Sequence, residues 1–404
     1  MQLMTGAVRT YAWGSRTAIA ELSGRPVPAP HPEAELWLGA HPADPALVHG
    51  PDGARSLLEV LRAEPVAALG ERSRAEFGDR LPFLLKVLAA DEPLSLQAHP
   101  SAVQAAQGFA DEQRRGVPLD SPVRNYRDAS HKPELICALT PFDALAGFRD
   151  VDRTVDLLTA LAGPELAPYA ALLSGQPDAG GLRALFTTWI TLPRPALDLL
   201  LPAVLDACVA HVRAHGAFAA EARTVLALGE SYPGDAGVLA ALLLNRITLQ
   251  PGQAIYLPAG NLHAYLDGVG VEIMANSDNV LRGGLTPKHV DVPELLRVLD
   301  FTAGDVPVSD GTTDGGPERT YPTPTAEFRL SRVDLAAGAQ VALAHGGPQV
   351  LLCTAGEAGL TADGDVLALP RGSAVWVPAA DGSVTVRAGA AGAQVFRATD
   401  GLQH

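Results

Sequence analysis

The chain has 404 residues and a formal net charge of −15, with 47% apolar and 19% charged residues. This acidic balance argues against nucleic acid or an anionic membrane as a partner, because both need a basic surface. No run of eighteen apolar residues occurs, and the first residues show no basic region followed by an apolar stretch. We therefore expect a cytoplasmic, monomeric globular protein with two to four subdomains.

Residues 1–148 mix short segments of β character with turns rich in proline and glycine. The apolar segments 36–38 and 81–89 predict strands, and the spacing over 57–68 predicts a helix. This part of the chain is therefore expected to be mixed, with strands predominating.

Two pairs of polar residues follow within the same part of the chain. Gln97 and His99 lie two positions apart, so their side chains share one face if the segment is extended. Lys132 and Glu134 have the same spacing just before an apolar run, so a cation and a carboxylate are expected to point the same way. Pro133 limits this stretch to the start or edge of a strand.

From 149 to 244 the pattern becomes helical. Apolar residues recur at intervals of three and four, most clearly over 196–208, which is typical of helices with one buried face. Pro- and Gly-containing breaks at 163–164, 192–193 and 232–235 separate the expected helices. No chemistry is required from this region.

Strand patterning returns near residue 247 and leads to a distinctive turn. The apolar run 254–257 predicts a short buried strand, and Gly252, Pro258 and Gly260 suit turn positions around it. The string P-x-G-x-x-H then ends at His263, so the turn is expected to aim this imidazole into an enclosed space.

Together these positions offer two imidazoles, a carboxylate and an amide oxygen. Gln97, His99, Glu134 and His263 form a set that suits zinc, with a water or substrate oxygen completing the shell. We therefore predict a zinc site built from these four side chains.

The few lysines point to the same segments. Lys86, Lys132 and Lys288 are the three lysines of the chain, and they fall in the motif segments 82–86, 130–134 and 258–288. Arg282 stands next to two glycines that allow close backbone approach, which makes it a candidate for binding an anion. Glu272 lies in a strand-like segment and is a candidate proton carrier.

Residues 307–404 consist of alternating runs separated by glycine and aspartate, which predicts an all-β module. Within it, 371–380 resembles 251–260, with the same five-residue interval between glycine and proline. The counterpart of His263 is Ser383, so we predict a duplicated β unit whose second copy holds no metal.

Cys137, Cys208 and Cys353 are odd in number, far apart and in apolar surroundings. This pattern predicts buried, reduced thiols. It fits neither a disulfide framework nor a zinc-thiolate site.

These segments resemble the type I mannose-6-phosphate isomerases, a zinc-dependent branch of the cupin superfamily. The motifs that carry the resemblance are Tyr11-Ala-Trp-Gly-Ser15, Pro82-Phe-Leu-Leu-Lys86, Leu96-Gln-Ala-His-Pro100, Ser130-His-Lys-Pro-Glu134 and the block from Pro258 to Lys288. They cover roughly residues 1–150 and 230–302.

The resemblance implies a mainly β fold. A cupin (jelly-roll) catalytic domain is expected from 1–148 and 245–306, an inserted helical domain from 149–244, and a metal-free, cupin-like domain from 307–404.

The resemblance also implies the activity. Such enzymes interconvert mannose 6-phosphate and fructose 6-phosphate, and the zinc ligands correspond here to Gln97, His99, Glu134 and His263, with one ion per chain. A zinc-stabilised enediolate is the expected intermediate.

The other site residues follow the same motifs. Lys132 and Arg282 are implicated in catalysis, while Lys288 and Ser95 are placed near the phosphate. The proton carrier stays open between Glu272, Lys132 and a metal-bound water.

Two other classes of function compete with this interpretation. A cupin dioxygenase holds iron with three histidines and a carboxylate, and Gln97 in place of a histidine argues against it. A non-catalytic sugar-binding module is expected to lack one or more of the metal-binding residues, yet all four predicted ligand positions carry a residue that can bind a metal here.

Overall fold

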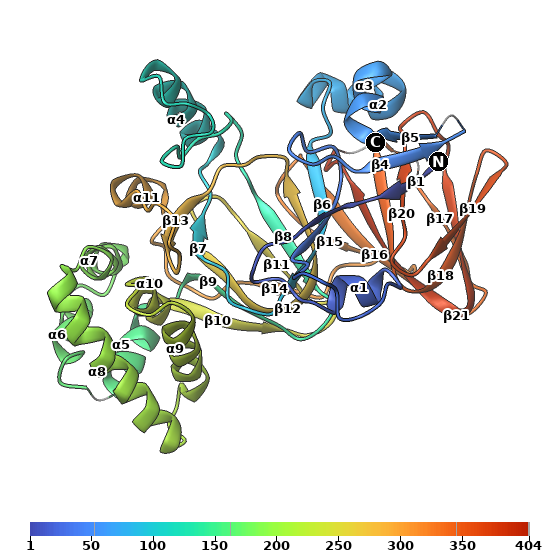
Figure 1. Cartoon of the computed structure of the whole chain (residues 1–404). Helices are drawn as coiled ribbons and strands as arrows, with labels where there is room; N and C mark the ends of the chain where they lie inside the picture. Colours follow the sequence, from blue (N-terminus) through green and yellow to red (C-terminus); the bar gives the residue numbers. More distant parts are fainter. Residues whose placement is uncertain (52, 162, 345, 403–404) are drawn as a thin grey trace.

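The computed structural model describes residues 1–402 apart from positions 52, 162 and 345. The molecule is mainly β, with two large antiparallel sheets and a group of helices beyond one end of the first sheet (Figure 1). We call the two sheets sheet I and sheet II.

Sheet I carries the predicted site. Its described strands are β2 (Ala7–Arg9), β3 (Glu35–Leu38), β6 (Phe83–Ala90), β7 (Leu96–Ala98), β8 (Glu134–Ala138), β9 (Phe142–Phe148), β10 (Leu244–Leu249), β11 (Ala254–Leu257), β12 (His263–Ala275), β13 (Leu281–Gly284) and β14 (Val308–Ser309). Strand β12 lies at its centre, where one half pairs with β6 and β8 and the other half pairs with β7 and β9.

Sheet II contains most of the C-terminal strands. Its described strands are β1 (Gln2–Thr5), β4 (Leu47–Gly50), β5 (Gly53–Ser56), β15 (Glu318–Tyr321), β16 (Arg329–Leu335), β17 (Gln340–Leu343), β18 (Gln349–Ala362), β19 (Asp365–Pro370), β20 (Ala374–Val377) and β21 (Val384–Thr399). Strand β1 pairs with β20, and β4 pairs with β1. The first part of the chain therefore contributes strands to both sheets. Conversely, β14, from the C-terminal part of the chain, pairs with β11 of sheet I.

Most helices lie in the segment where the spacing predicted them. The described helices are α1 (Ala18–Leu22), α2 (Leu57–Ala63), α3 (Pro65–Phe77), α4 (Ala102–Arg114), α5 (Val151–Ala160), α6 (Ala167–Gly175), α7 (Ala179–Ile190), α8 (Arg194–Arg213), α9 (Ala219–Ser231), α10 (Gly237–Ala240), a 3-10 turn (Ala241–Leu243) and α11 (Val292–Val298). Helices α5 to α10 form one group at the left of Figure 1.

The helix expected over 57–68 is two helices. Ser56 begins α2 with a capping box that includes Glu59, and Pro65 begins α3 because proline suits the first turn of a helix but interrupts a continuing one. The single prediction was therefore correct in type and wrong in extent.

Helix α8 is long and apolar enough to cross a membrane by length and composition alone. Core helices of water-soluble proteins meet the same criterion, so this is weak evidence for a span. Its apolar side chains Leu201, Val204 and Cys208 are buried in a core shared with neighbouring helices.

Sheets I and II share an apolar core. Leu135 of β8 and Ile273 of β12 lie in one buried cluster with Trp376 of β20, Phe396 of β21 and Phe328. Burial of large aromatic side chains is among the strongest sources of stability in a folded chain. The two sheets therefore support one another.

The sheets repeat one local arrangement. In sheet I, β8 pairs with β11 and β12, and in sheet II, β18 pairs with β20 and β21. Gly252 (φ 88°) donates its N–H to Ala138 O at 2.8 Å, and Gly372 (φ 79°) donates to Cys353 O at 2.8 Å. This repetition in space matches the sequence echo between 251–260 and 371–380.

The three cysteines behave as the sequence predicted. Cys137, Cys208 and Cys353 are buried free thiols. Burial raises the pKa of each thiol, to about 11, 12 and 11 respectively, so none is poised as a thiolate.

Candidate metal centre and active site

The turn before β12 aims His263 inward. The strand β11 ends at Leu257, and Pro258 O accepts a hydrogen bond from Asn261 N–H at 3.2 Å to close the turn. Gly260 has a positive φ of 78° and donates its N–H to His99 O at 2.8 Å. The turn is therefore tied directly to the segment that carries the second imidazole.

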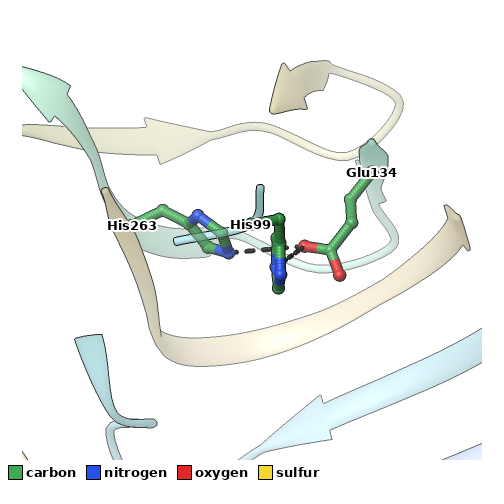
Figure 2. A group of neighbouring side chains, drawn as sticks. All are labelled: His99, Glu134 and His263. Atoms are coloured by element: carbon green, nitrogen blue, oxygen red, sulfur yellow. Dashed lines mark ion pairs between the residues drawn. The ribbon is translucent and has the colours of Figure 1, made fainter. Parts of the chain in front are cut away.

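Three side chains converge at this point. The Nε2 atoms of His99 and His263 each lie 3.3 Å from Glu134 Oε2. Figure 2 shows both imidazoles beside this carboxylate. Their possible ligand atoms all lie within 4.8 Å of one another, and all three side chains are buried. Among the described residues this is the one histidine, cysteine and carboxylate group of such geometry.

The His99 ring is held in a state that can bind a metal. Its Nδ1 lies 2.7 Å from Asn279 O, and a carbonyl can only accept, so Nδ1 carries the proton. Burial lowers the pKa of His99 to about 4, so the ring is neutral near pH 7 and Nε2 presents a lone pair. This buried Nε2 makes no hydrogen bond in the described chain.

A lone pair facing a carboxylate oxygen leaves two acceptors without a donor between them. A cation satisfies both, and imidazole nitrogen with carboxylate oxygen is a donor set that suits zinc. His263 is oriented in the same way, since its Nδ1 lies 3.0 Å from Asn261 O. The residues present therefore fit a metal ion.

The structure brings Gln97 beside this group. In the antiparallel ladders, Gln97 of β7 stands directly opposite His263 on one side and Arg282 on the other. Residues directly opposite in such a ladder project from the same face of the sheet. Gln97 therefore shares a face with His263, which is what the predicted fourth ligand requires.

The second carboxylate oxygen of Glu134 forms an ion pair with Lys132. The Lys132 Nζ lies 2.9 Å from Glu134 Oε1, so the two side chains do point the same way, as their spacing predicted. Burial on its own raises the pKa of Glu134, but the adjacent Lys132 ammonium lowers it, and the pKa lies well below its ordinary value. Glu134 is therefore a carboxylate at neutral pH.

Glu272 is the centre of a buried polar network. Its Oε2 lies 3.2 Å from Lys86 Nζ, and its Oε1 accepts from Tyr265 Oη at 2.9 Å. Lys86 also faces Glu35 Oε1 at 3.5 Å. Burial raises the pKa of Glu272; Lys86 opposes this rise, while Glu134 and Glu35 add to it.

Part of this network was missed at the level of sequence. The sequence places Lys86 in a motif but does not identify its partner. It gives no local motif that indicates a role for Tyr265 or Glu35. A signal existed, because Lys86 is the one charged residue in the apolar strand β6, and a fully buried lysine requires a carboxylate partner. The register places it opposite Glu272.

The anion-binding candidates lie near one another. Burial lowers the pKa of Arg282, and nearby Arg127 lowers it further. Partial burial of the ammonium, together with Arg282 and Arg127, likewise lowers the pKa of Lys288, although the residue as a whole is exposed. None of the three cations forms an ion pair with a carboxylate in the described parts of the chain, so their charge is available to an anion. Arg127 was not predicted.

Ser95 is the candidate with the least structural support. It is half-buried and lies two residues before Gln97, ahead of β7. Among the residues that the structure describes, no hydrogen bond joins its side chain to Arg282 or Lys288.

Comparison with known proteins places the chain in a family. Residues 1–151 match the family described as phosphomannose isomerase type I, catalytic domain. The chain is 39% identical to mannose-6-phosphate isomerase from Escherichia coli (strain K12), covering 96% of this chain and 97% of the relative. The human enzyme is 36% identical over 73% of this chain and 72% of its own length. The chain belongs to the mannose-6-phosphate isomerases.

Solved structures of mannose-6-phosphate isomerases share the whole fold. The K86A variant of phosphomannose isomerase from Salmonella typhimurium matches with a TM-score of 0.90 and 36% identity, covering 100% of both chains. A zinc-bound mannose-6-phosphate isomerase matches with a TM-score of 0.89 and 36% identity, covering 99% of both chains.

In this member of the mannose-6-phosphate isomerase family, the repeated unit in sheet II differs from the unit in sheet I at the positions of the candidate metal site. Glu134 stands opposite Leu257 in sheet I, and the equivalent residue opposite Val377 in sheet II is Gln349. The Gln349 Oε1 accepts from Arg397 Nε at 2.8 Å and is thus already satisfied. With Ser383 at the position of His263, the second unit lacks the counterparts of two of the predicted ligands.

Proposed function

We propose that the chain interconverts mannose 6-phosphate and fructose 6-phosphate. The observation that carries this proposal is the buried group of His99, Glu134 and His263, whose His99 Nε2 has no donor, next to an unpaired cationic cluster. Membership of the isomerase family supports the choice of substrate.

The metal in this proposal is one zinc ion per chain, held by Gln97, His99, Glu134 and His263. A relative of the same fold binds zinc, and the donor set here suits that ion. When bound, zinc supplies Lewis-acid stabilisation of the negative charge that develops on a substrate oxygen.

Glu272 is proposed as the group that moves the proton. Isomerisation removes a proton from the carbon beside the carbonyl, gives an enediolate, and returns the proton to the neighbouring carbon. A buried carboxylate with a raised pKa accepts such a proton better than an ordinary one. Tyr265 and Lys86 hold its two oxygens in place.

Lys132 and Arg282 are proposed to stabilise the enediolate. Lys132 is buried and held by Glu134 Oε1, so its charge sits at a fixed point beside the metal site. Arg282 stands across the ladder from Gln97. Fixed charges of this kind act on the transition state without reorganising.

Lys288 and Ser95 are proposed to bind the phosphate, together with Arg282. Lys288 is exposed, has no carboxylate partner within the described residues, and lies close enough to Arg282 for the two charges to interact. An acidic protein needs such a local cluster to capture a dianion.

The finer description of the fold is also a proposal. We propose cupin (jelly-roll) domains, with 1–148 and 245–306 forming the catalytic one, 149–244 an inserted helical domain and 307–404 a metal-free second copy. The repeated strand arrangement of sheets I and II supports this division. Strands β1, β4, β5 and β14 are exchanged across it.

The proposals that the chain is monomeric and cytoplasmic, without nucleic acid or membrane partners, rest on the sequence. A net charge of −15 supports the absence of polyanionic partners.

A coupled assay tests the function. Fructose 6-phosphate formed from mannose 6-phosphate is measured before and after dialysis against a chelator, and again after zinc is restored. We expect activity to vanish with the metal and to return with zinc. Turnover that persists in protein shown by elemental analysis to be metal-free would contradict the proposal, and tightly bound iron in place of zinc would favour a dioxygenase.

A further inference from the structure

Asn279 occupies an unusual position beside the site. It lies between β12 and β13, and it is fully buried with 0% of its surface exposed. Its backbone carbonyl is the acceptor that fixes the Nδ1 proton of His99, at 2.7 Å. A residue far along the chain therefore sets which nitrogen of His99 faces Glu134.

The side chain of Asn279 is bonded to a second segment. Its Oδ1 accepts from Arg127 N–H at 2.7 Å and from Asp128 N–H at 3.3 Å. Its Nδ2 donates to Asp128 O at 2.8 Å and to Ser130 O at 2.8 Å. The oxygen and the nitrogen of the side-chain amide thus both form hydrogen bonds with the backbone of residues 127–130.

Only a carboxamide makes all of these bonds. An aspartate in this place lacks the donor, and a leucine of similar size lacks both donor and acceptor. Buried backbone N–H and C=O groups that are left without partners destabilise the fold. The geometry therefore depends on this residue type.

The segment held by Asn279 leads directly to active-site groups. Arg127 belongs to the cationic cluster with Arg282 and Lys288, and Lys132 and Glu134 follow Ser130 within four residues. Ser277 strengthens the same link, because its Oγ donates to Asp128 Oδ1 at 2.9 Å and accepts from Asn279 N–H at 3.2 Å.

We propose that Asn279 is a positioning residue of the active site, which joins the metal ligand His99 to the segment 127–134 that supplies cations and the carboxylate ligand. Asn279 itself touches neither metal nor substrate. The kinetic part of this inference rests on the proposed isomerase function, whereas the structural part does not.

The test uses the zinc-loaded full chain and the variant Asn279→Ala. This change keeps the backbone carbonyl for His99 and removes the bonds to residues 127–130. We expect amide hydrogen exchange in peptides covering 125–131 to become at least tenfold faster, zinc content to stay near one per chain, and kcat/KM to fall by at least tenfold.

Asn245→Ala is the matched control. Asn245 is also buried and donates to Ala146 O, Gly147 O and Gly304 O, but it holds backbone outside segment 127–134. We expect it to lower thermal stability to a similar degree, with exchange at 125–131 unchanged and kcat/KM within twofold. This comparison separates positioning from general destabilisation.

If Asn279→Ala does not fold, Ser277→Ala decides the question, because it removes a hydroxyl from the same link. For Ser277→Ala we also expect faster exchange at 125–131 and a lower kcat/KM, and both changes should be smaller than those expected for Asn279→Ala. Unchanged exchange at 125–131, or unchanged kcat/KM in a folded variant with faster exchange, would overturn the proposal. Wild-type protein without isomerase activity would refute the proposed function, while the exchange result would still stand or fall by itself.

Discussion

At the residue scale, the candidate metal centre depends on the orientation of two imidazoles. Each ring gives its Nδ1–H to a backbone carbonyl, of Asn279 for His99 and of Asn261 for His263, and this leaves each Nε2 turned toward Glu134. Such partners of metal-binding histidines fix the tautomer and tune affinity.

Replacing one imidazole should therefore remove the metal. We expect His263→Ala to purify with less than one tenth of an equivalent of zinc and with activity at background, while its circular dichroism stays that of the wild type. The fold persists because large apolar cores, and not the ion, hold it together. His49→Ala, which removes an exposed imidazole on β4, is the control. Stoichiometric zinc in His263→Ala would exclude His263 as a ligand.

Replacements of Lys288 and Arg282, the two cations proposed to lie at the phosphate, are expected to change different kinetic constants. Lys288→Ala is expected to raise KM for mannose 6-phosphate with a smaller change in kcat, because a remote contact is made equally in the ground and transition states. Arg282→Ala is expected to lower kcat on the order of 10²-fold, as for loss of a fixed charge-stabilising donor. Steady-state kinetics measures both. Near-normal kcat in Arg282→Ala would limit Arg282 to binding, and unchanged KM in Lys288→Ala would place the phosphate elsewhere.

Functional residues could be predicted from the sequence where a short local motif indicates their chemistry. The ligand set was predicted from short spacings and a turn motif. Lys86 and Glu35 were not assigned because their role depends on Glu272, which reaches them only through strand pairing distant in sequence. Arg127 and Asn279 were missed for the same reason.

At the element scale, the turn between β11 and β12 needs glycine. Gly260 has a φ of 78°, and an added Cβ would lie 3.0 Å from Val298 O and 3.0 Å from Asp300 N. Its N–H also bonds to His99 O. A shift of this turn would therefore also move the backbone of His99, a predicted metal ligand.

Gly260→Ala is expected to destabilise the protein by about 1–3 kcal/mol. It should also weaken zinc retention during chelator titration, since His99 shifts with the turn. Gly364→Ala is the control, because Gly364 has a φ of 89° with open space around it and lies in the hairpin between β18 and β19. If both variants keep zinc equally well, the turn does not support the site.

Short elements with strong turn signals were predicted well, and long ones were not. The strand 254–257 has the predicted bounds, whereas β18 and β21 are much longer than the short runs expected in this part of the chain. Register shifts near Cys353 and Gly356 interrupt the alternation of buried and exposed residues, so one bulged strand looked like several.

At the scale of the whole molecule, one repeated unit contains the predicted metal ligands, and the other has Gln349 and Ser383 at the positions of Glu134 and His263. Ser383→Ala is expected to leave kcat and KM within about twofold, because a small exposed hydroxyl at a position without ligands has no metal to hold. The coupled assay measures this, with His263→Ala as the contrasting variant. A second tightly bound metal mapped to sheet II would contradict the interpretation.

The pairing of β1 with β20 also has a consequence for how the chain is made. On the ribosome, β1 leaves the exit tunnel first, and its partner follows roughly 20–70 s later at translation rates of about 5–20 residues per second. His263 emerges well before β20, so all four predicted metal ligands have been synthesised while sheet II is still open. Until then, β1 pairs only with β4 and its other edge is open, which is the kind of surface that recruits other strands. We therefore expect nascent chains released before β20 to aggregate through this N-terminal edge.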